Sequence, residues 1–124
     1  MMTKGRIVVV DYDDCAQRAL VEILEDEGYD AICARTGEEA LRIVSQQGAD
    51  LVLMEVLLPG MSGFETCKRL KGDDELPPMP VCFLSNKNDI ETKLRGFLNG
   101  GSRYITKPID PSHLLDTIRS VIGS

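Results

Sequence analysis

The fold is decided by the stretch from residue 50 to residue 63, Asp-Leu-Val-Leu-Met-Glu-Val-Leu-Leu-Pro-Gly-Met-Ser-Gly. Its apolar run is too short for a helix and too continuous for a half-exposed strand. It therefore predicts a strand buried on both faces in the middle of a parallel sheet. The run leads to a carboxylate, Glu55, and the turn-forming residues after it predict a loop. Taken alone, Glu55 is most simply the first solvated residue after a core strand, but this strand end is also where open α/β sheets bind ligands.

Strands and helices alternate on both sides of this stretch. Short apolar runs predict strands at 6–10, 29–34, 51–54, 81–84 and 103–106. Helical spacing predicts a helix that ends before Gly28, then helices at about 38–47, 64–71, 89–98 and 111–122. Such alternation predicts an α/β fold with helices on both faces of a parallel sheet. Right-handed crossovers and the length favour the flavodoxin-like strand order 2-1-3-4-5, in a single domain that spans residues 1–124.

Composition excludes several classes of protein. The net charge of −6 argues against direct nucleic-acid binding, which needs a basic surface. No apolar run approaches the ~20 residues of a membrane span, and the start does not resemble a signal peptide. We therefore expect a cytoplasmic protein.

The cysteines form no metal-binding or disulfide pattern. There is no Cys-x-x-Cys, and the single histidine, His113, cannot complete a zinc set. We expect Cys33 and Cys82 to be buried in strands, His113 to be exposed, and all four thiols to be reduced; the other two are Cys15 and Cys67.

Polar side chains gather where the predicted strands end. Asp11, Tyr12 and Asp13 follow the first strand, Glu55 ends the third, and Ser85 and Lys107 follow the fourth and fifth. These strand ends are expected to meet at one edge of the sheet. Carboxylates can hold Mg²⁺, while a hydroxyl and an ammonium can hold phosphoryl oxygens. The alternative is that strand ends are simply polar, and four converging ends favour a site.

The chain resembles the receiver domain of bacterial response regulators along its whole length. The motifs that carry the resemblance are Ile-Val-Val-Val-Asp11, the 50–63 stretch, Phe-Leu-Ser85, and Gly-Ser-Arg-Tyr104-Ile-Thr-Lys107-Pro108. Their intervals also agree, with 30 residues from Glu55 to Ser85 (85 − 55) and 52 from Glu55 to Lys107 (107 − 55).

The resemblance implies roles for these residues. In receivers an aspartate at position 55 accepts a phosphoryl group from a histidine kinase, and an acidic pair at positions 11 and 12 holds Mg²⁺. Ser85 and Lys107 are then phosphoryl-binding residues. Ser85 and Tyr104 form the switch. A cis peptide bond is expected at Pro108, and no catalytic residue or enzymatic activity is implied.

Two departures weaken that expectation. Glu55 replaces the phosphoaccepting aspartate, and Tyr12 replaces the second acidic residue; Asp13, one position along, reaches a metal less directly. Glutamate extends the carboxylate by about 1.5 Å, and a ~1 Å misplacement can cost on the order of a hundredfold in rate. Losing a carboxylate also weakens Mg²⁺ binding. We therefore expect phosphoacceptance to be impaired or lost.

The sequence leaves three interpretations open for such a receiver. Glu55 can mimic the phosphorylated state by reaching Lys107 or Ser85, the site can have drifted to a scaffold, or the domain can still be phosphorylated with Mg²⁺. In each case the expected partners are a histidine kinase or another signalling protein, and an output protein or domain. The partner face implied by the resemblance is the fourth helix, fifth strand and fifth helix, with basic residues Lys93, Arg95, Arg103 and Arg119.

A rival from another class is a flavin- or nucleotide-binding enzyme on the same fold. It would need a phosphate-binding loop after the first strand that is rich in Gly, Ser or Thr. The actual Asp11-Tyr12-Asp13-Asp14 is anionic and disfavours this rival.

Overall fold

The computed structural model describes residues 3–122, and five parallel strands form its central sheet. The strands are β1 (Arg6–Val10), β2 (Asp30–Ala34), β3 (Leu51–Glu55), β4 (Val81–Ser85) and β5 (Arg103–Thr106). Their order, β2-β1-β3-β4-β5, confirms the predicted topology. The predicted single domain also includes residues 1–2 and 123–124, which lie outside the described residues.

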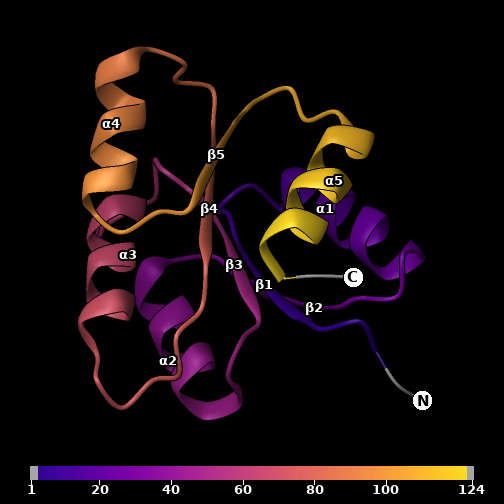
Figure 1. Ribbon diagram of the computed structural model, residues 1–124, viewed down its shortest axis with the longest axis horizontal. Coiled ribbons are helices and arrows are strands. Elements are labelled where there is room, and N and C mark those ends of the chain that lie inside the picture. Colours follow the sequence, from indigo (N-terminus) through magenta and orange to yellow (C-terminus); the bar gives the residue numbers. More distant parts are fainter. Residues whose placement is uncertain (1–2, 123–124) are drawn as a thin grey trace.

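The helices cover both faces of this sheet (Figure 1). α1 (Asp14–Asp26) and α5 (Pro111–Ile122) lie on one face. α2 (Gly37–Gln47), α3 (Gly63–Gly72) and α4 (Ile90–Leu98) lie on the other. N-caps set where four of them begin, because side-chain oxygens of Asp13, Thr36, Ser62 and Asp89 accept backbone N–H groups of the first turn. None of the helices in residues 3–122 combines the length and apolar character needed to cross a bilayer.

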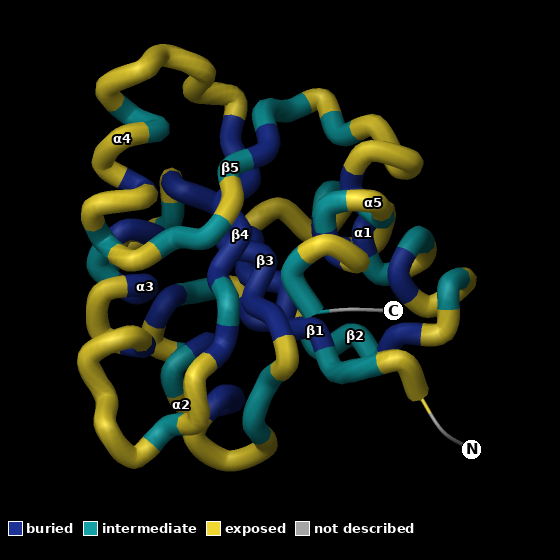
Figure 2. Tube along the Cα trace, in the orientation of Figure 1, coloured by how far each residue is buried: buried dark blue, intermediate teal, exposed yellow. Residues whose placement is uncertain are grey.

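The centre of the sheet is buried on both sides, as Figure 2 shows in dark blue. All five residues of β3 are buried, as are all five of β4. Glu55 is the last residue of β3 and is only 8% exposed. The simple interpretation of Glu55 as a solvated residue after the strand is therefore wrong, because the strand continues one residue further and carries the carboxylate into the interior.

One expectation about burial is wrong, and α4 buries unusually little. Cys33 is exposed, because β2 is an edge strand; Cys67 and Cys82 are buried, and all four cysteines are free. In α4 the apolar residues Ile90, Leu94, Phe97 and Leu98 are all exposed. The residue of α4 that is buried is Gly96, and a Cβ there would lie 3.1 Å from Phe83. The absence of a side chain at Gly96 thus lets α4 approach the sheet.

Candidate functional site

Three strand ends bring opposite charges together at one edge of the sheet. Asp11 follows β1, Glu55 ends β3 and Lys107 follows β5. The Lys107 Nζ lies 2.6 Å from Glu55 Oε2 and 3.0 Å from Asp11 Oδ2. Both carboxylates are buried, and the ammonium is largely so. A single cation thus bridges two anions in a partly dry site, where charge interactions are stronger than in water.

The second oxygen of each carboxylate is held by a backbone amide. The Asp13 N–H donates to Asp11 Oδ1 at 3.0 Å, and the Leu57 N–H donates to Glu55 Oε1 at 3.3 Å. Each carboxylate oxygen of Asp11 and Glu55 therefore has a protein partner.

The bridge also changes the acidity of Lys107. Burial by itself would lower the pKa of this lysine, but the hydrogen bonds to Glu55 and Asp11 outweigh burial and raise the pKa above its usual value. Lys107 is therefore a permanent cation at physiological pH.

The loop after β3 depends on one glycine. Gly63 begins α3, and its N–H donates to the Val56 carbonyl at 2.9 Å. A Cβ at this position would lie 2.2 Å from the Glu55 carbonyl oxygen. Any larger residue would push α3 away from β3 and shift the backbone that carries Glu55.

A second chain of contacts links the site to the surface beside α4. Ser85 is buried at the end of β4, and its Oγ accepts the Lys87 N–H at 3.2 Å. The Lys87 carbonyl accepts the Tyr104 hydroxyl at 2.6 Å. The backbone of Lys87 therefore connects Ser85 to Tyr104. We did not predict this role from the sequence, because backbone groups leave no residue-type signal.

The side chains of Tyr12 and Asp13, which follow Asp11, contact groups other than Glu55 and Lys107. Tyr12 is 53% exposed, and the Arg35 guanidinium lies over its ring, 4.9 Å from the centroid. The Asp13 carboxylate caps α1 by accepting the Cys15 N–H at 2.9 Å. Arg35 was not among the predicted site residues. A signal was available, since Arg35 directly follows β2, Tyr12 lies in the short loop after β1, and these strands are neighbours.

The donor set does not fit a magnesium site of the family's kind. Among residues 3–122, no three side chains of His, Cys, Asp or Glu are grouped so that they could hold a metal ion. Asp11 and Glu55 share Lys107, Tyr12 offers no carboxylate, and Asp13 is committed to the helix cap. Mg²⁺ requires several oxygen ligands in near-ideal octahedral geometry, which this arrangement does not provide.

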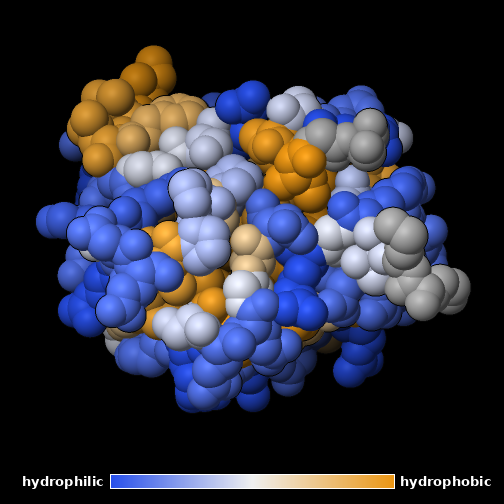
Figure 3. Space-filling view, turned by 60° about the horizontal axis from the view of Figure 1, so that its bottom comes forward, coloured by the Kyte–Doolittle hydropathy of each residue, from blue (hydrophilic) through white to orange (hydrophobic). Residues whose placement is uncertain are grey.

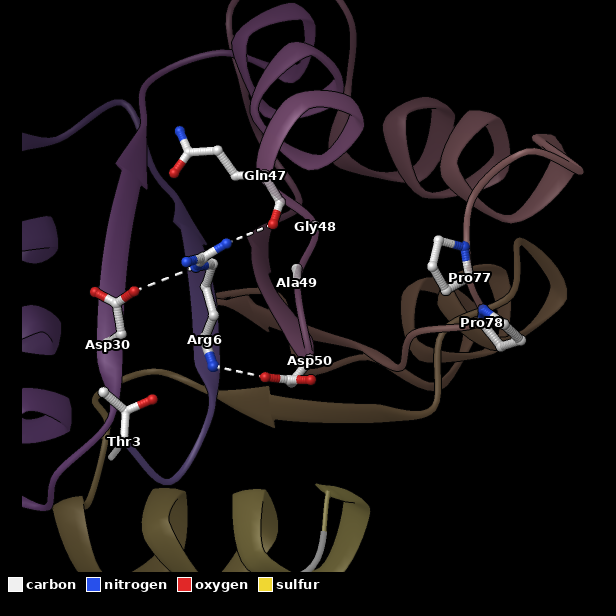
Figure 4. Close-up of a pocket in the computed structure, with 9 residues that line it drawn as sticks. All are labelled: Thr3, Arg6, Asp30, Gln47, Gly48, Ala49, Asp50, Pro77 and Pro78. Atoms are coloured by element: carbon white, nitrogen blue, oxygen red, sulfur yellow. Dashed lines mark hydrogen bonds and ion pairs between the residues drawn. The ribbon is translucent and has the colours of Figure 1, made fainter. Parts of the chain in front are cut away.

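Two further features complete the description, one beside the site and one far from it. The Lys107-Pro108 peptide bond is cis, as the resemblance implied. A hollow of about 470 Å³ lies at the opposite end of the sheet, beside the amino ends of β1 and β2 (Figure 4). Arg6 lines it and is already bonded to Asp30 and to the Gln47 carbonyl. This hollow is separate from the site formed by Asp11, Glu55 and Lys107.

Comparisons with known proteins identify the family of this chain. The family model described as "Response regulator receiver domain" matches residues 7–119. Protein PilH of Pseudomonas aeruginosa is 32% identical over 119 residues, covering 96% of this chain and 98% of PilH. Other curated relatives are about twice as long as this chain, which spans about half of each.

Solved structures give the same result. The chemotaxis protein CheY4 of Vibrio cholerae has a TM-score of 0.89 and 27% identity, with coverage of 98% of this chain and 99% of that chain. The BeF3-activated receiver domain of RstA from Klebsiella pneumoniae has a TM-score of 0.89 and 25% identity, with coverage of 96% and 99%. Sequence and structure together therefore show that this chain belongs to the response regulator receiver family of two-component signalling.

Proposed function

We propose that this receiver domain signals through protein–protein contacts and that ordinary phosphorylation at residue 55 is impaired or lost. The observation that carries the proposal is the direct ion pair between Glu55 Oε2 and Lys107 Nζ, 2.6 Å long. In the family, Lys107 is the residue that would hold a phosphoryl group attached at position 55. Here the longer carboxylate already reaches that lysine.

Two features oppose phosphoryl transfer to Glu55. The reaction depends on in-line positioning and on cations that neutralise the phosphoryl oxygens. Both oxygens of Glu55 are occupied by Lys107 and the Leu57 amide, and the metal-ligand position holds Tyr12. A phosphodonor would have to break the ion pair and would lack the usual metal.

The contacts beyond the site support Glu55 as a mimic of the phosphorylated state. The Lys107 ammonium forms an ion pair with Glu55, and the backbone N–H of Lys107 donates to the Ser85 carbonyl at 2.8 Å. Ser85 is joined through Lys87 to Tyr104, beside α4. A permanent charge at residue 55 is thus connected to the elements that change in a receiver switch. If the site had lost its function and the domain were only a scaffold, these contacts would not need to be intact.

Receiver domains interact with histidine kinases and output domains, and the output face of this one is proposed to be α4, β5 and α5. Its α4 carries an exposed apolar surface, visible at the upper left of Figure 3, formed by Ile90, Leu94, Phe97 and Leu98. Lys93 lies over the Tyr104 ring, 6.0 Å from its centroid, so the switch tyrosine borders this surface. A change in Tyr104 would directly alter the face that a partner contacts.

The test is an amide-resolved NMR titration with Mg²⁺, followed by beryllofluoride, which imitates an acyl phosphate. We expect no saturable shifts at Ser85, Tyr104 or Lys107 in the unsubstituted chain. The Tyr12→Asp, Glu55→Asp double variant is the matched control and should respond, as should the RstA receiver domain, for which a BeF3-activated structure exists. Saturable shifts in the unsubstituted chain would overturn the proposal and leave a phosphate-responsive switch.

The mimic is tested separately with Glu55→Gln, which keeps the shape of the side chain and removes its charge. We expect the ring signals of Tyr104 and the amide signals of α4 to move, because the Glu55–Lys107 ion pair is lost. Unchanged signals would refute the mimic and leave a scaffold.

A further inference from the structure

A guanidinium lies beside the position where the family has a second metal-binding carboxylate. Val10 pairs with Ala34 across β1 and β2, and the Asp11 N–H donates to the Ala34 carbonyl at 3.1 Å. Arg35 directly follows Ala34, and Tyr12 is the second residue after Val10, so the pairing of β1 with β2 brings the two loops that carry them together. Arg35 would lie next to whatever side chain occupied position 12.

Contacts with the first turns of α1 and α2 and with Tyr12 hold Arg35 in this place. Its backbone N–H donates to Glu39 at 3.3 Å, and its Nε lies 3.5 Å from Asp14 Oδ1. Its guanidinium stacks on Tyr12, 4.9 Å from the ring centroid. A stacked cation of this kind is attracted by the negative face of the ring.

The Arg35 guanidinium would form an ion pair, and not a stacking contact, with a carboxylate at position 12. Arginine is always charged, and it pairs with carboxylates through two parallel N–H donors. A carboxylate paired in this way is a poor ligand for Mg²⁺, and the arginine also repels the metal directly.

We propose that Arg35 is a specificity-determining residue that weakens the binding of divalent cations at this edge of the sheet. Its effect is separate from that of Tyr12: with a carboxylate restored at position 12, Mg²⁺ binding stays weaker as long as Arg35 remains. The inference rests on the proposed function, since it explains why the metal-dependent reaction is absent.

The experiment compares Mg²⁺ affinity, measured by NMR titration at constant ionic strength, in Tyr12→Asp and in Tyr12→Asp, Arg35→Gln. The second variant should bind Mg²⁺ about tenfold more tightly, the effect expected from removing one charge a few ångströms from a divalent ion at the protein surface. Tyr12→Asp, Arg35→Lys keeps the charge and should bind no more tightly than Tyr12→Asp.

Arg42→Gln in the Tyr12→Asp background is the matched control. Arg42 is an exposed arginine of α2 that pairs with Glu39 at 3.9 Å, so this variant changes the net charge equally without altering a neighbour of residue 12. It should change the Mg²⁺ affinity by less than about twofold. The inference would be refuted if Tyr12→Asp and Tyr12→Asp, Arg35→Gln bound Mg²⁺ with equal affinity. It would also be refuted if Arg42→Gln raised the Mg²⁺ affinity as much as Arg35→Gln does.

The two proposals fail separately. A response of the unsubstituted chain to Mg²⁺ and beryllofluoride would refute the proposed function, while the ratio of affinities between variants alone decides the role of Arg35. Arg35 is half exposed, and dispersed amide spectra would confirm that each variant folds.

Discussion

Two buried carboxylates share one ammonium at the site, which makes Lys107 the residue on which the local charge balance depends. Asp11 is 4% exposed and Glu55 8%, and Lys107 is paired with both. Removing one partner of a buried ion pair is far more costly than removing an exposed one, because the remaining charge is left without compensation.

We therefore expect Lys107→Met to lower the free energy of unfolding by about 3 kcal/mol, since it leaves two buried anions unpaired. Urea denaturation checks the prediction. Lys68→Met, the same substitution at an exposed lysine of α3, is the control and should change stability by less than about 0.5 kcal/mol. Equal effects of the two substitutions would show that the carboxylates find other partners or protonate when Lys107 is absent.

Among the helices, α4 is held least firmly. Its one buried residue is a glycine, and Ile90, Leu94, Phe97 and Leu98 are exposed. By contrast, α5 buries Leu114 and Ile118 completely. A helix that buries little apolar surface gains little from folding and opens easily.

We expect the amides of α4 to exchange with deuterium much faster than those of α5. The difference in opening free energy should be at least about 2 kcal/mol, which is roughly the contribution of one buried leucine. Hydrogen exchange followed by NMR measures both helices in one sample. Equal protection of α4 and α5 would mean that the apolar face of α4 is covered in solution.

Most strand and helix bounds were predictable because local patterns determine them. Continuous apolar runs identify β1, β3 and β4, and helical spacing gives the bounds of α2 to α5 to within one residue. The sequence of α4 also carries apolar residues at helical spacing, which are Ile90, Leu94, Phe97 and Leu98. Periodicity shows that a helix has an apolar face, but it does not show whether another element covers that face.

The part of the site that was predictable is the part whose position is set by the order and the ends of the strands. The position of Lys107 and Asp11 at one edge follows from the strand order, whereas the burial of Glu55 depends on how far β3 continues. The exposure of Cys33 follows from the position of β2 at the edge of the sheet. Contacts made by backbone groups, such as those of Lys87, need coordinates.

At the scale of the whole molecule, both sides of the sheet contain a buried thiol. Cys67 belongs to the core between the sheet and α2 and α3, and Cys82 belongs to the core beneath α1 and α5. Burial raises the pKa of Cys67 to about 11 and that of Cys82 to about 12, from an ordinary 9.0. Both thiols therefore stay protonated in the folded chain at a pH where they ionise in the unfolded chain.

This difference makes the fold sensitive to alkaline pH. Above pH 9 the unfolded chain binds fewer protons than the folded chain, so stability is fully present below that pH and falls as the pH rises. Two such thiols should together remove about 2 kcal/mol from the free energy of unfolding between about pH 9 and 10. The raised pKa of Lys107 acts in the same direction at higher pH.

Urea denaturation at a series of pH values measures this loss. In Cys67→Ala, Cys82→Ala the whole curve should lie lower, because two small cavities are created, but its fall across this pH range should be shallower by about 2 kcal/mol. Cys15→Ala removes an exposed thiol and should leave the slope unchanged. If the double variant keeps the full slope, the alkaline loss comes from other groups, and the two cores are permeable enough for their thiols to ionise without unfolding.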